Sequence, residues 1–238
     1  MRTLQQTIHL MVFGICSATS LPAAAERVGS GFYLGVAAGH SSVDIDRSEL
    51  DGAVFDGLSA GGAIVVSGSS TFEDGDTSGA LLAGYHFNRF IAIEVSYVDF
   101  GTAEYRSTGT VNPPGPVFLA PASVDLSFES RGAAVAARGT LPLGNVVDLH
   151  GRGGLFFARS DLTTTVRIGP SQGSQKDSMD SVSGFISAGA GFHLGERWTL
   201  SLDWSRYLNV GDEDEDEDFR TSDGSDVDTA SIGASYRF

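Results

Sequence analysis

Regular alternation of apolar residues with small or polar residues is the feature that most constrains this chain. From Gly31 onward the alternation returns in segments of about ten residues, the length that a tilted strand needs to cross a bilayer. In the segment 91–98, Ile91 and Val95 share one face of the predicted strand and Glu94 lies on the other. Each segment therefore predicts a strand with one apolar face and one face of small or polar side chains.

Eight such segments follow one another, and the connections between them alternate between short and long. Short turns occur around Asn88, Gly144 and Gly195, and long segments cover residues 44–76, 101–123, 161–180 and 208–227. This asymmetry is typical of outer-membrane barrels, which have short periplasmic turns and longer extracellular loops. We therefore expect an all-β fold, an eight-stranded antiparallel up-and-down transmembrane β-barrel. The barrel domain would cover residues 26–238 and carry four long extracellular loops.

A soluble two-sheet sandwich is the alternative fold with eight alternating strands. A sandwich would bury the apolar faces in one core instead of placing glycine, alanine, serine and isolated charges opposite them. An even strand number also lets the sheet close on itself, so that no strand edge is left unpaired in lipid. Both arguments favour the barrel.

The N-terminal segment Met1–Ala25 has the features of a secretory signal peptide. Arg2 supplies the charged start, a short apolar core follows, and Ala23–Ala25 offers a cleavage site. We expect cleavage after Ala25 and export to the cell outer membrane. A membrane anchor would need a longer apolar core, and lipidation at Cys16 would need a small residue where Ile15 stands.

The charge balance excludes one class of partner. The chain has 30 acidic and 15 basic residues, and its formal net charge is −15. A nucleic-acid-binding surface needs a basic patch, and the sequence shows none. We therefore expect no nucleic acid as a partner.

Three sequence motifs together resemble a known family. Gly31–Gly35 opens the first predicted strand, Gly84–Asn88 leads into Ile93–Gly101, and Ser235–Phe238 ends the chain. In their order and spacing they resemble the transmembrane barrel of outer membrane protein A (OmpA) and its OmpX-like and opacity-type relatives. The chain stops where that barrel ends, so the resemblance does not extend to a peptidoglycan-binding domain.

The same resemblance implies a role for the aromatic C-terminus. Tyr236 and Phe238 look like the signal that the barrel-assembly machinery reads. Phe238 as a lipid-facing aromatic of the membrane interface is compatible with that role. The expected partners are therefore the assembly machinery and the lipid and lipopolysaccharide of the outer membrane.

Alternation places four charged residues on the inward face of the predicted barrel, namely Glu94, Arg138, Arg152 and Asp203. Two positive and two negative charges in a narrow lumen have to pair, because an isolated buried ion is costly. In OmpA-type barrels similar positions hold a charge network that plugs or gates the lumen. A static plug and a gated narrow pore remain the two interpretations, and an open porin-like channel is not expected from eight strands.

In the fourth predicted strand, which ends near Leu141, two large apolar residues fall on the face that is expected to line the lumen. Leu126 and Phe128 share the face of Arg138, which is the lumenal face. We therefore expect this strand to carry a bulge or to leave the membrane near Gly132.

Two further groups of residues could bind metal ions. His86, His150 and His193 project inward near the short turns, where imidazoles could bind a metal, although strand order places them apart and no carboxylate spacing supports it. The run Asp212–Asp218 favours a solvated loop, with loose Ca²⁺ or Mg²⁺ binding as the alternative. The candidate ligands there are Asp212, Asp214, Asp216 and Asp218.

The search for catalytic motifs finds one weak candidate. His40 and Ser42 share an outward face, the spacing that lipid A deacylases use, but without the flanking residues expected of that site. We therefore expect a non-enzymatic protein with a structural or surface-interaction role and a largely plugged lumen, without a cofactor. The alternatives are a narrow channel or transporter for small solutes and, third, a lipid A-modifying enzyme.

Overall fold

The computed structural model describes residues 30–115, 118–211 and 225–238, which form nine strands and one helix. None of the helical structure in these ranges is long and apolar enough to cross a membrane. The elements are β1 (Gly31–Val43), α1 (Arg47–Ala60), β2 (Ile64–Glu73), β3 (Gly75–His86), β4 (Ile91–Asn112), β5 (Ala120–Pro142), β6 (Val147–Ile168), β7 (Ser171–Leu194), β8 (Trp198–Val210) and β9 (Ser225–Arg237).

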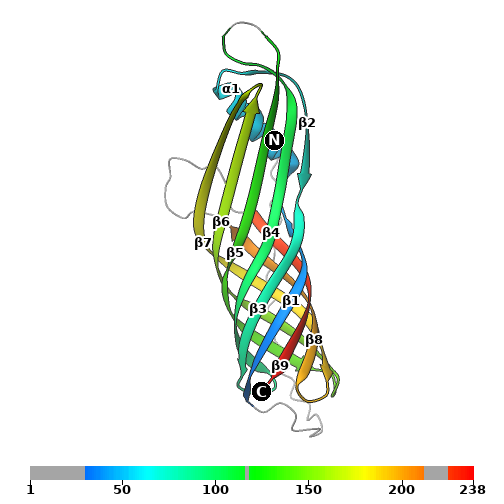
Figure 1. Cartoon of the computed structure of the whole chain (residues 1–238). Helices are drawn as coiled ribbons and strands as arrows, with labels where there is room; N and C mark the ends of the chain where they lie inside the picture. The colour runs from blue at the N-terminus through cyan, green and yellow to red at the C-terminus, as the bar shows by residue number, and fades with distance from the viewer. Residues whose placement is uncertain (1–29, 116–117, 212–224) are drawn as a thin grey trace, which may run out of the picture.

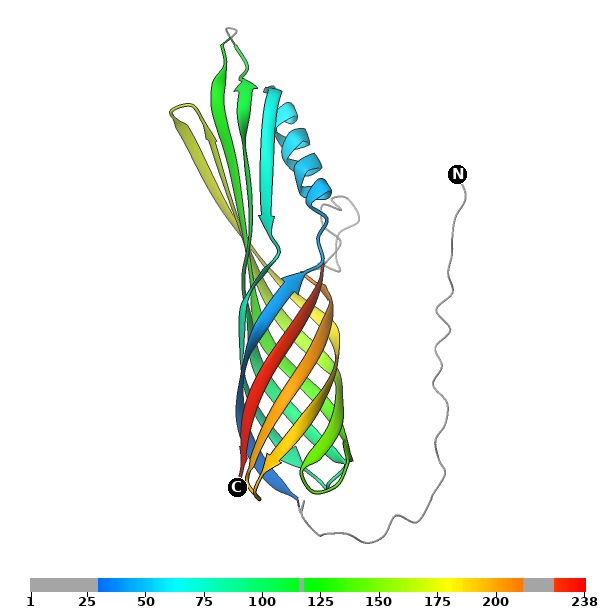
Figure 2. The same ribbon diagram turned by 90° about the vertical axis from the view of Figure 1, so that its right-hand side faces the viewer.

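Eight of the strands close into a ring. All neighbours are antiparallel, in the order β4-β3-β1-β9-β8-β7-β6-β5, and β5 pairs back to β4. The first and last strands meet at Tyr33 and Arg237, so the ring has no free edge over its lower half (Figures 1 and 2). The expected eight-stranded antiparallel up-and-down barrel is thus confirmed, and β2 is an additional strand that pairs only with β4.

The exterior of the ring is a band of exposed apolar side chains. In β4 the outward residues Ile91, Ile93, Val95 and Tyr97 are exposed, whereas Glu94 between them is buried. The same alternation runs round the other strands, so the surface exposes a contiguous apolar belt. Such a surface is stable against lipid, and a closed ring satisfies every backbone group within that environment.

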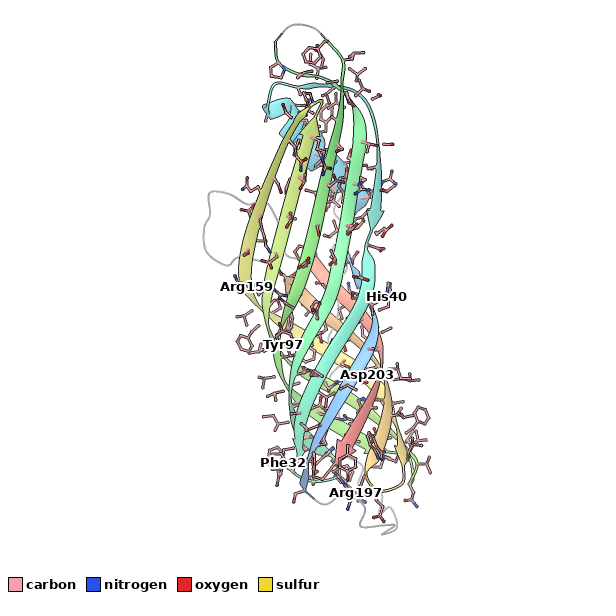
Figure 3. The ribbon with its side chains drawn as sticks, in the orientation of Figure 1. Phe32, His40, Tyr97, Arg159, Arg197 and Asp203 are labelled. Carbon is pink, nitrogen blue, oxygen red and sulfur yellow. The ribbon has the colours of Figure 1, made fainter. Side chains whose placement is uncertain are left out.

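Charged and aromatic residues mark the two limits of this band. At the upper limit Asp99, Arg131, Arg159 and Asp180 lie opposite one another on four neighbouring strands, β4 to β7. At the lower limit are the exposed rings of Phe32, Trp198 and Phe238 together with Arg197. Figure 3 shows Arg159 where the barrel meets the upper strands and Phe32 and Arg197 at the opposite end. The band between them is the membrane-spanning part.

The three short turns expected around Asn88, Gly144 and Gly195 all lie at this lower end (Figure 1). In the β3–β4 turn the side chain of Asn88 accepts hydrogen bonds from the backbone N–H groups of Phe90 and Ile91. The remaining two short turns join β5 to β6 and β7 to β8.

The long segments expected as loops contain regular structure instead. Strands β4 to β7 continue far above the membrane band, so that residues 101–123 and 161–180 are mostly strand. Segment 44–76 contains α1 and β2. The physical reason is that the backbone groups of these segments pair with one another; Arg106 lies opposite Asp125, for example, and Thr163 opposite Lys176. The signal peptide 1–25 and the acidic run Asp212–Asp218 lie outside the described residues.

The strand that ends near Leu141 was expected to carry a bulge or to leave the membrane near Gly132, and the bulge lies on its neighbour instead. Strand β5 pairs with β6 without a register shift from Ala122 to Pro142, so Gly132 carries no bulge. The shift is on β4 between Asp99 and Thr102, where Gly101 has a φ of 75°, a conformation that favours glycine. Leu126 and Phe128 keep the inward parity of Arg138, but they lie above the membrane band, where they line an apolar cavity.

Helix α1 lies above the barrel, beside β2 (Figure 2). Asp46 caps its N-terminus by accepting a hydrogen bond from the backbone N–H of Ser48. Leu50, Val54 and Leu58 recur at a spacing of four and form its half-buried face, but no residue of the helix is fully buried.

Candidate functional site

The lower part of the lumen contains a network of buried charges. Arg138 Nη1 donates to Glu94 Oε1 at 3.0 Å, and Arg152 Nη1 to Glu94 Oε2 at 3.4 Å. Arg152 Nη2 also donates to Asp203 Oδ1 at 2.6 Å. The structure therefore brings together all four of the charged residues that alternation placed in the lumen.

Four more residues extend this network. The Tyr33 hydroxyl donates to Glu94 at 2.5 Å, and His150 Nε2 lies 2.7 Å from Asp203. The Asp148 carboxylate contacts two imidazoles, at 3.1 Å from His150 Nδ1 and 2.7 Å from His193 Nε2. We call these eight side chains the lumenal network: Tyr33, Glu94, Arg138, Asp148, His150, Arg152, His193 and Asp203.

Sequence reasoning did not identify Asp148 and Tyr33 as members. Both have the inward parity of their strands, and Asp148 precedes His150 by two residues, so the signal was present in the alternation. The register between strands determines that they meet the quartet. A close approach also matters, because a Cβ at Gly189 would overlap the Asp203 carboxylate and the His150 ring.

The three inward histidines do not form a common site. His150 and His193 both contact Asp148, whereas the ring of His86 packs on Tyr33 at 4.7 Å and its Nδ1 has no hydrogen-bond partner. In the described part of the chain, no group of three or more His, Cys, Asp or Glu side chains could hold a metal ion.

A second layer of buried side chains lies above the network, at the upper end of the membrane band. Phe100, Phe156 and Tyr207 pack edge to face, with ring centroids 4.8 to 5.3 Å apart, and Phe185 stacks on Tyr207 at 5.0 Å. Phe156 has an exposed fraction of 0%. Phe156 follows Arg152 by four residues on β6, and Tyr207 follows Asp203 by four on β8, so the aromatic cluster lies about 13 Å further along these strands than the network.

His40 and Ser42 do not form a catalytic pair in the structure. Both lie at the upper end of β1, and Figure 3 shows His40 on the outer surface there. The Ser42 hydroxyl is 3.5 Å from the Asp74 carboxylate and makes no described hydrogen bond to His40. A nucleophilic serine would donate its proton to the histidine, which acts as the base.

The C-terminal aromatics lie on the outer surface at the lower end of the barrel. The ring of Tyr236 packs between Trp198 and Phe238, at 5.1 and 5.3 Å, and its hydroxyl accepts a hydrogen bond from Arg197 at 2.8 Å. Phe238 is 72% exposed. Phe238 is therefore accessible from outside the barrel wall, and Tyr236 is half-buried beside it.

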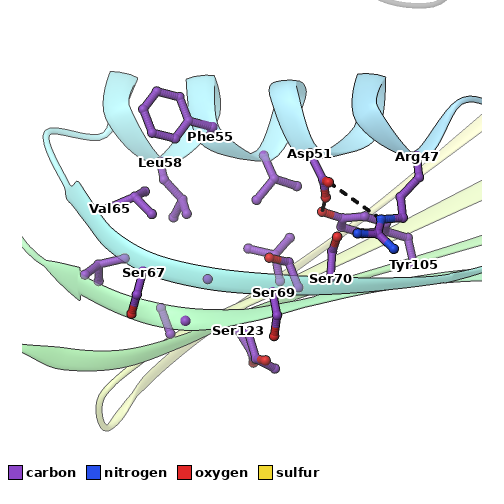
Figure 4. A pocket seen from close by; sticks show the side chains of 18 residues that line it. Arg47, Asp51, Phe55, Leu58, Val65, Ser67, Ser69, Ser70, Tyr105 and Ser123 are labelled. Atoms are coloured by element: carbon purple, nitrogen blue, oxygen red, sulfur yellow. Dashed lines mark hydrogen bonds and ion pairs between the residues drawn. The ribbon is translucent and has the colours of Figure 1, made fainter.

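A groove between α1 and the extended sheet contains a group of polar contacts around Asp51 (Figure 4). The Tyr105 hydroxyl donates to Asp51 at 2.6 Å, and Arg47 forms an ion pair with Asp51 at 3.7 Å. Hydrogen bonds from the hydroxyls of Ser70 and Tyr105 lower the pKa of Asp51, and burial raises the pKa of Tyr105. Asp51 thus stays ionised and tethers the first half of the helix to β4.

Comparisons with known proteins identify one matching family and several similar structures. Residues 29–238 match the family model of the OmpA-like transmembrane domain. Similar solved structures include Neisserial surface protein A (NspA), with 16% identity over 89% of this chain and 100% of that chain and a TM-score of 0.46. The attachment invasion locus protein Ail of Yersinia pestis has 15% identity, covering 88% and 97% of the two chains, and a TM-score of 0.43. OprG of Pseudomonas aeruginosa has 14% identity, covering 89% and 98%, and a TM-score of 0.38.

No curated protein sequence matches the chain. The family model, however, covers nearly the whole chain, including every strand of the ring. The chain belongs to the family of OmpA-like transmembrane domains and is an outer-membrane β-barrel.

Proposed function

We propose that this protein is a non-enzymatic outer-membrane barrel whose lumen is closed and whose function resides at the cell surface. The observation that carries the proposal is the complete burial of Phe156 in the aromatic cluster inside the ring. An eight-stranded barrel has an interior just wide enough for side chains to fill, and here the side chains fill it at two levels.

The two levels close the lumen by different chemistry. The aromatic cluster presents an apolar constriction that strips water from any passing ion. The lumenal network links its carboxylates directly to arginine and histidine side chains, so ions would have to displace short contacts such as the one between Arg152 and Asp203. Because the layers lie in series, opening one of them leaves the other closed.

The remaining features support a role at the surface. The exposed Arg131 and Arg159 at the upper limit of the membrane band would face the phosphates of lipopolysaccharide. The exposed Phe238 and the half-buried Tyr236 beside it suit recognition by the barrel-assembly machinery. Asp212, Asp214, Asp216 and Asp218 would bind Ca²⁺ or Mg²⁺ loosely outside the cell. A hydrolytic role has no support, because the described hydrogen bond of Ser42 goes to Asp74 and none joins Ser42 to His40.

Planar-bilayer recording with the full-length protein tests the closed lumen. We expect no reproducible conductance from the wild type, from Arg138→Ala or from Phe156→Ala, since each variant opens one layer only. A quadruple variant removes both layers and should produce steps of conductance. It combines Phe100→Ala and Phe156→Ala with Arg138→Ala and Arg152→Ala.

The matched control is Arg131→Ala, because Arg131 lies on the same strand as Arg138 but faces outward. Reproducible conductance of the wild type that changes on Arg138→Ala would instead assign the protein to the gated narrow channels. That result would contradict the proposal even if the surface were also functional.

A further inference from the structure

A large apolar cavity lies above the barrel, between α1 and the inward face of the extended strands. Its volume is about 670 Å³, which is within the range of pockets that hold small-molecule ligands. We infer that this cavity binds free, uncharged, apolar small molecules that arrive from outside the cell. The inference deepens the proposed surface role and rests on it.

Two apolar faces meet across this cavity without filling it. Leu50, Val54 and Leu58 of α1 are only half-buried, and so are Leu126 of β5 and Val166 of β6 on the opposite wall. Leaving so much apolar surface uncovered is unfavourable in water. An apolar ligand between the faces would cover both of them at once.

The polar content of the cavity determines the class of ligand. Among its 23 described lining residues none is charged, and only Tyr105, Thr164 and Ser225 carry a polar side chain. The Tyr105 hydroxyl is already committed to Asp51. A carboxylate or an ammonium group would enter the cavity without a counter-ion, which costs several kcal/mol. The cavity therefore favours uncharged molecules.

Two other occupants fit the chemistry less well. The chain between Gly211 and Ser225, two residues that line the cavity, includes the wholly acidic run Asp212–Asp218, which is unsuited to an apolar site. A lipid acyl chain would have to leave the outward face of the barrel, because Leu126 and Phe128 lie on the inward face of β5, opposite to that of Arg131. A free small molecule meets neither obstacle.

The floor of the cavity indicates binding and not passage. Val210 and Phe128 line its lower part. Val210 belongs to the same buried cluster as Phe100, Phe156 and Tyr207, which closes the barrel beneath. A ligand in the cavity is therefore held at the cell surface.

Fluorescence titration of the full-length protein in lipid nanodiscs tests this inference. The probe is phenylnaphthylamine, which is uncharged, and the comparison ligand is its sulfonated analogue anilinonaphthalenesulfonate. Ala53→Trp fills the cavity from α1, whereas Gly52→Trp adds the same side chain at a neighbouring position that does not line it. The heat-dependent gel mobility of folded barrels verifies that each variant is folded.

We expect saturable binding of one probe per chain to the wild type and to Gly52→Trp, with at least about tenfold weaker binding to Ala53→Trp. The sulfonated analogue should also bind at least about tenfold more weakly than the uncharged probe. Probe uptake no greater than in empty nanodiscs, equal binding by both tryptophan variants, equal binding of the sulfonate, or competition by the nanodisc phospholipid would each overturn the inference. If the probe does not bind and the wild type does not conduct, the closed-lumen proposal is unaffected. If the wild type conducts and the probe binds as expected, only the closed-lumen proposal is overturned.

Discussion

At the scale of single residues, Glu94 is the centre of the lumenal network. Its carboxylate accepts hydrogen bonds from Tyr33, Arg138 and Arg152 and has an exposed fraction of 4%. A buried ion pair adds little net stability over an apolar core, but removing one partner leaves the others uncompensated. The network therefore makes Glu94 hard to replace.

We predict that Glu94→Gln lowers the free energy of unfolding by about 3 kcal/mol, since both arginines lose their shared carboxylate. Urea unfolding, followed by the fluorescence of Trp198 and Trp204, measures the change. Glu104→Gln, an exposed carboxylate of the same strand, is the control and should alter stability by less than about 0.5 kcal/mol. Equal free energies of unfolding for the two variants would show that Glu94 does not stabilise the fold.

How much of the network could be predicted also depends on individual residues. Alternation alone placed Glu94, Arg138, Arg152 and Asp203 on the lumenal face, because a period of two allows no other face once the apolar side meets lipid. The alternation does not show which inward residues lie at the same height along the barrel axis. Asp148 and His193 lie on the neighbouring strands β6 and β7, and only the register between those strands shows that they meet.

At the scale of elements, the bulge on β4 separates the closed barrel from the open sheet above it. Above Gly101 strand β4 exchanges its partner β3 for β2. A Cβ at Gly101 would lie 2.6 Å from the Asp76 carboxylate and 2.8 Å from the Thr77 carbonyl oxygen, and its φ of 75° disfavours other residues. The exchange of partners thus depends on this glycine.

Gly101→Ala should destabilise the upper sheet locally, by at least about 1 kcal/mol from the backbone conformation alone. Amide hydrogen exchange should accelerate in β2 and in residues 102–111 of β4, while residues 91–98 remain protected. The control is Gly79→Ala, because Gly79 pairs with Asp99 just below the bulge and has open space for a Cβ. Uniform exchange changes along all of β4 would contradict the separation of the two parts.

The elements above the membrane were the part of the fold that sequence analysis misjudged. Their signals were present: Leu162, Val166 and Ile168 share one parity in β6, and Leu50, Val54 and Leu58 recur at helical spacing after the N-cap Asp46. A barrel strand was expected to end at the membrane, so the alternating residues beyond that limit were interpreted as loops. The parity of Leu126 and Phe128 was correct evidence that β5 leaves the membrane without changing face.

At the scale of the whole molecule, the structure combines a closed barrel with an open sheet and helix on one side only (Figures 1 and 2). The period of two, the even strand number and the short turns were sufficient to predict the ring. The apolar cavity could not be predicted, because it arises between α1 and residues of strands β4 to β9, which are far from the helix in sequence. Both proposals require that this open side face the outside of the cell.

Labelling of single cysteines in intact cells with a membrane-impermeant maleimide tests that orientation most directly. Cys16 is the only cysteine of the chain, so the wild type serves as the blank. Gly173→Cys lies near the tip of the β6–β7 hairpin above the membrane band, and Asn145→Cys in the short β5–β6 turn. We predict that Gly173→Cys is labelled in intact cells and that Asn145→Cys is labelled only after the outer membrane is permeabilised. Labelling of Asn145→Cys in intact cells with protection of Gly173→Cys would contradict the account.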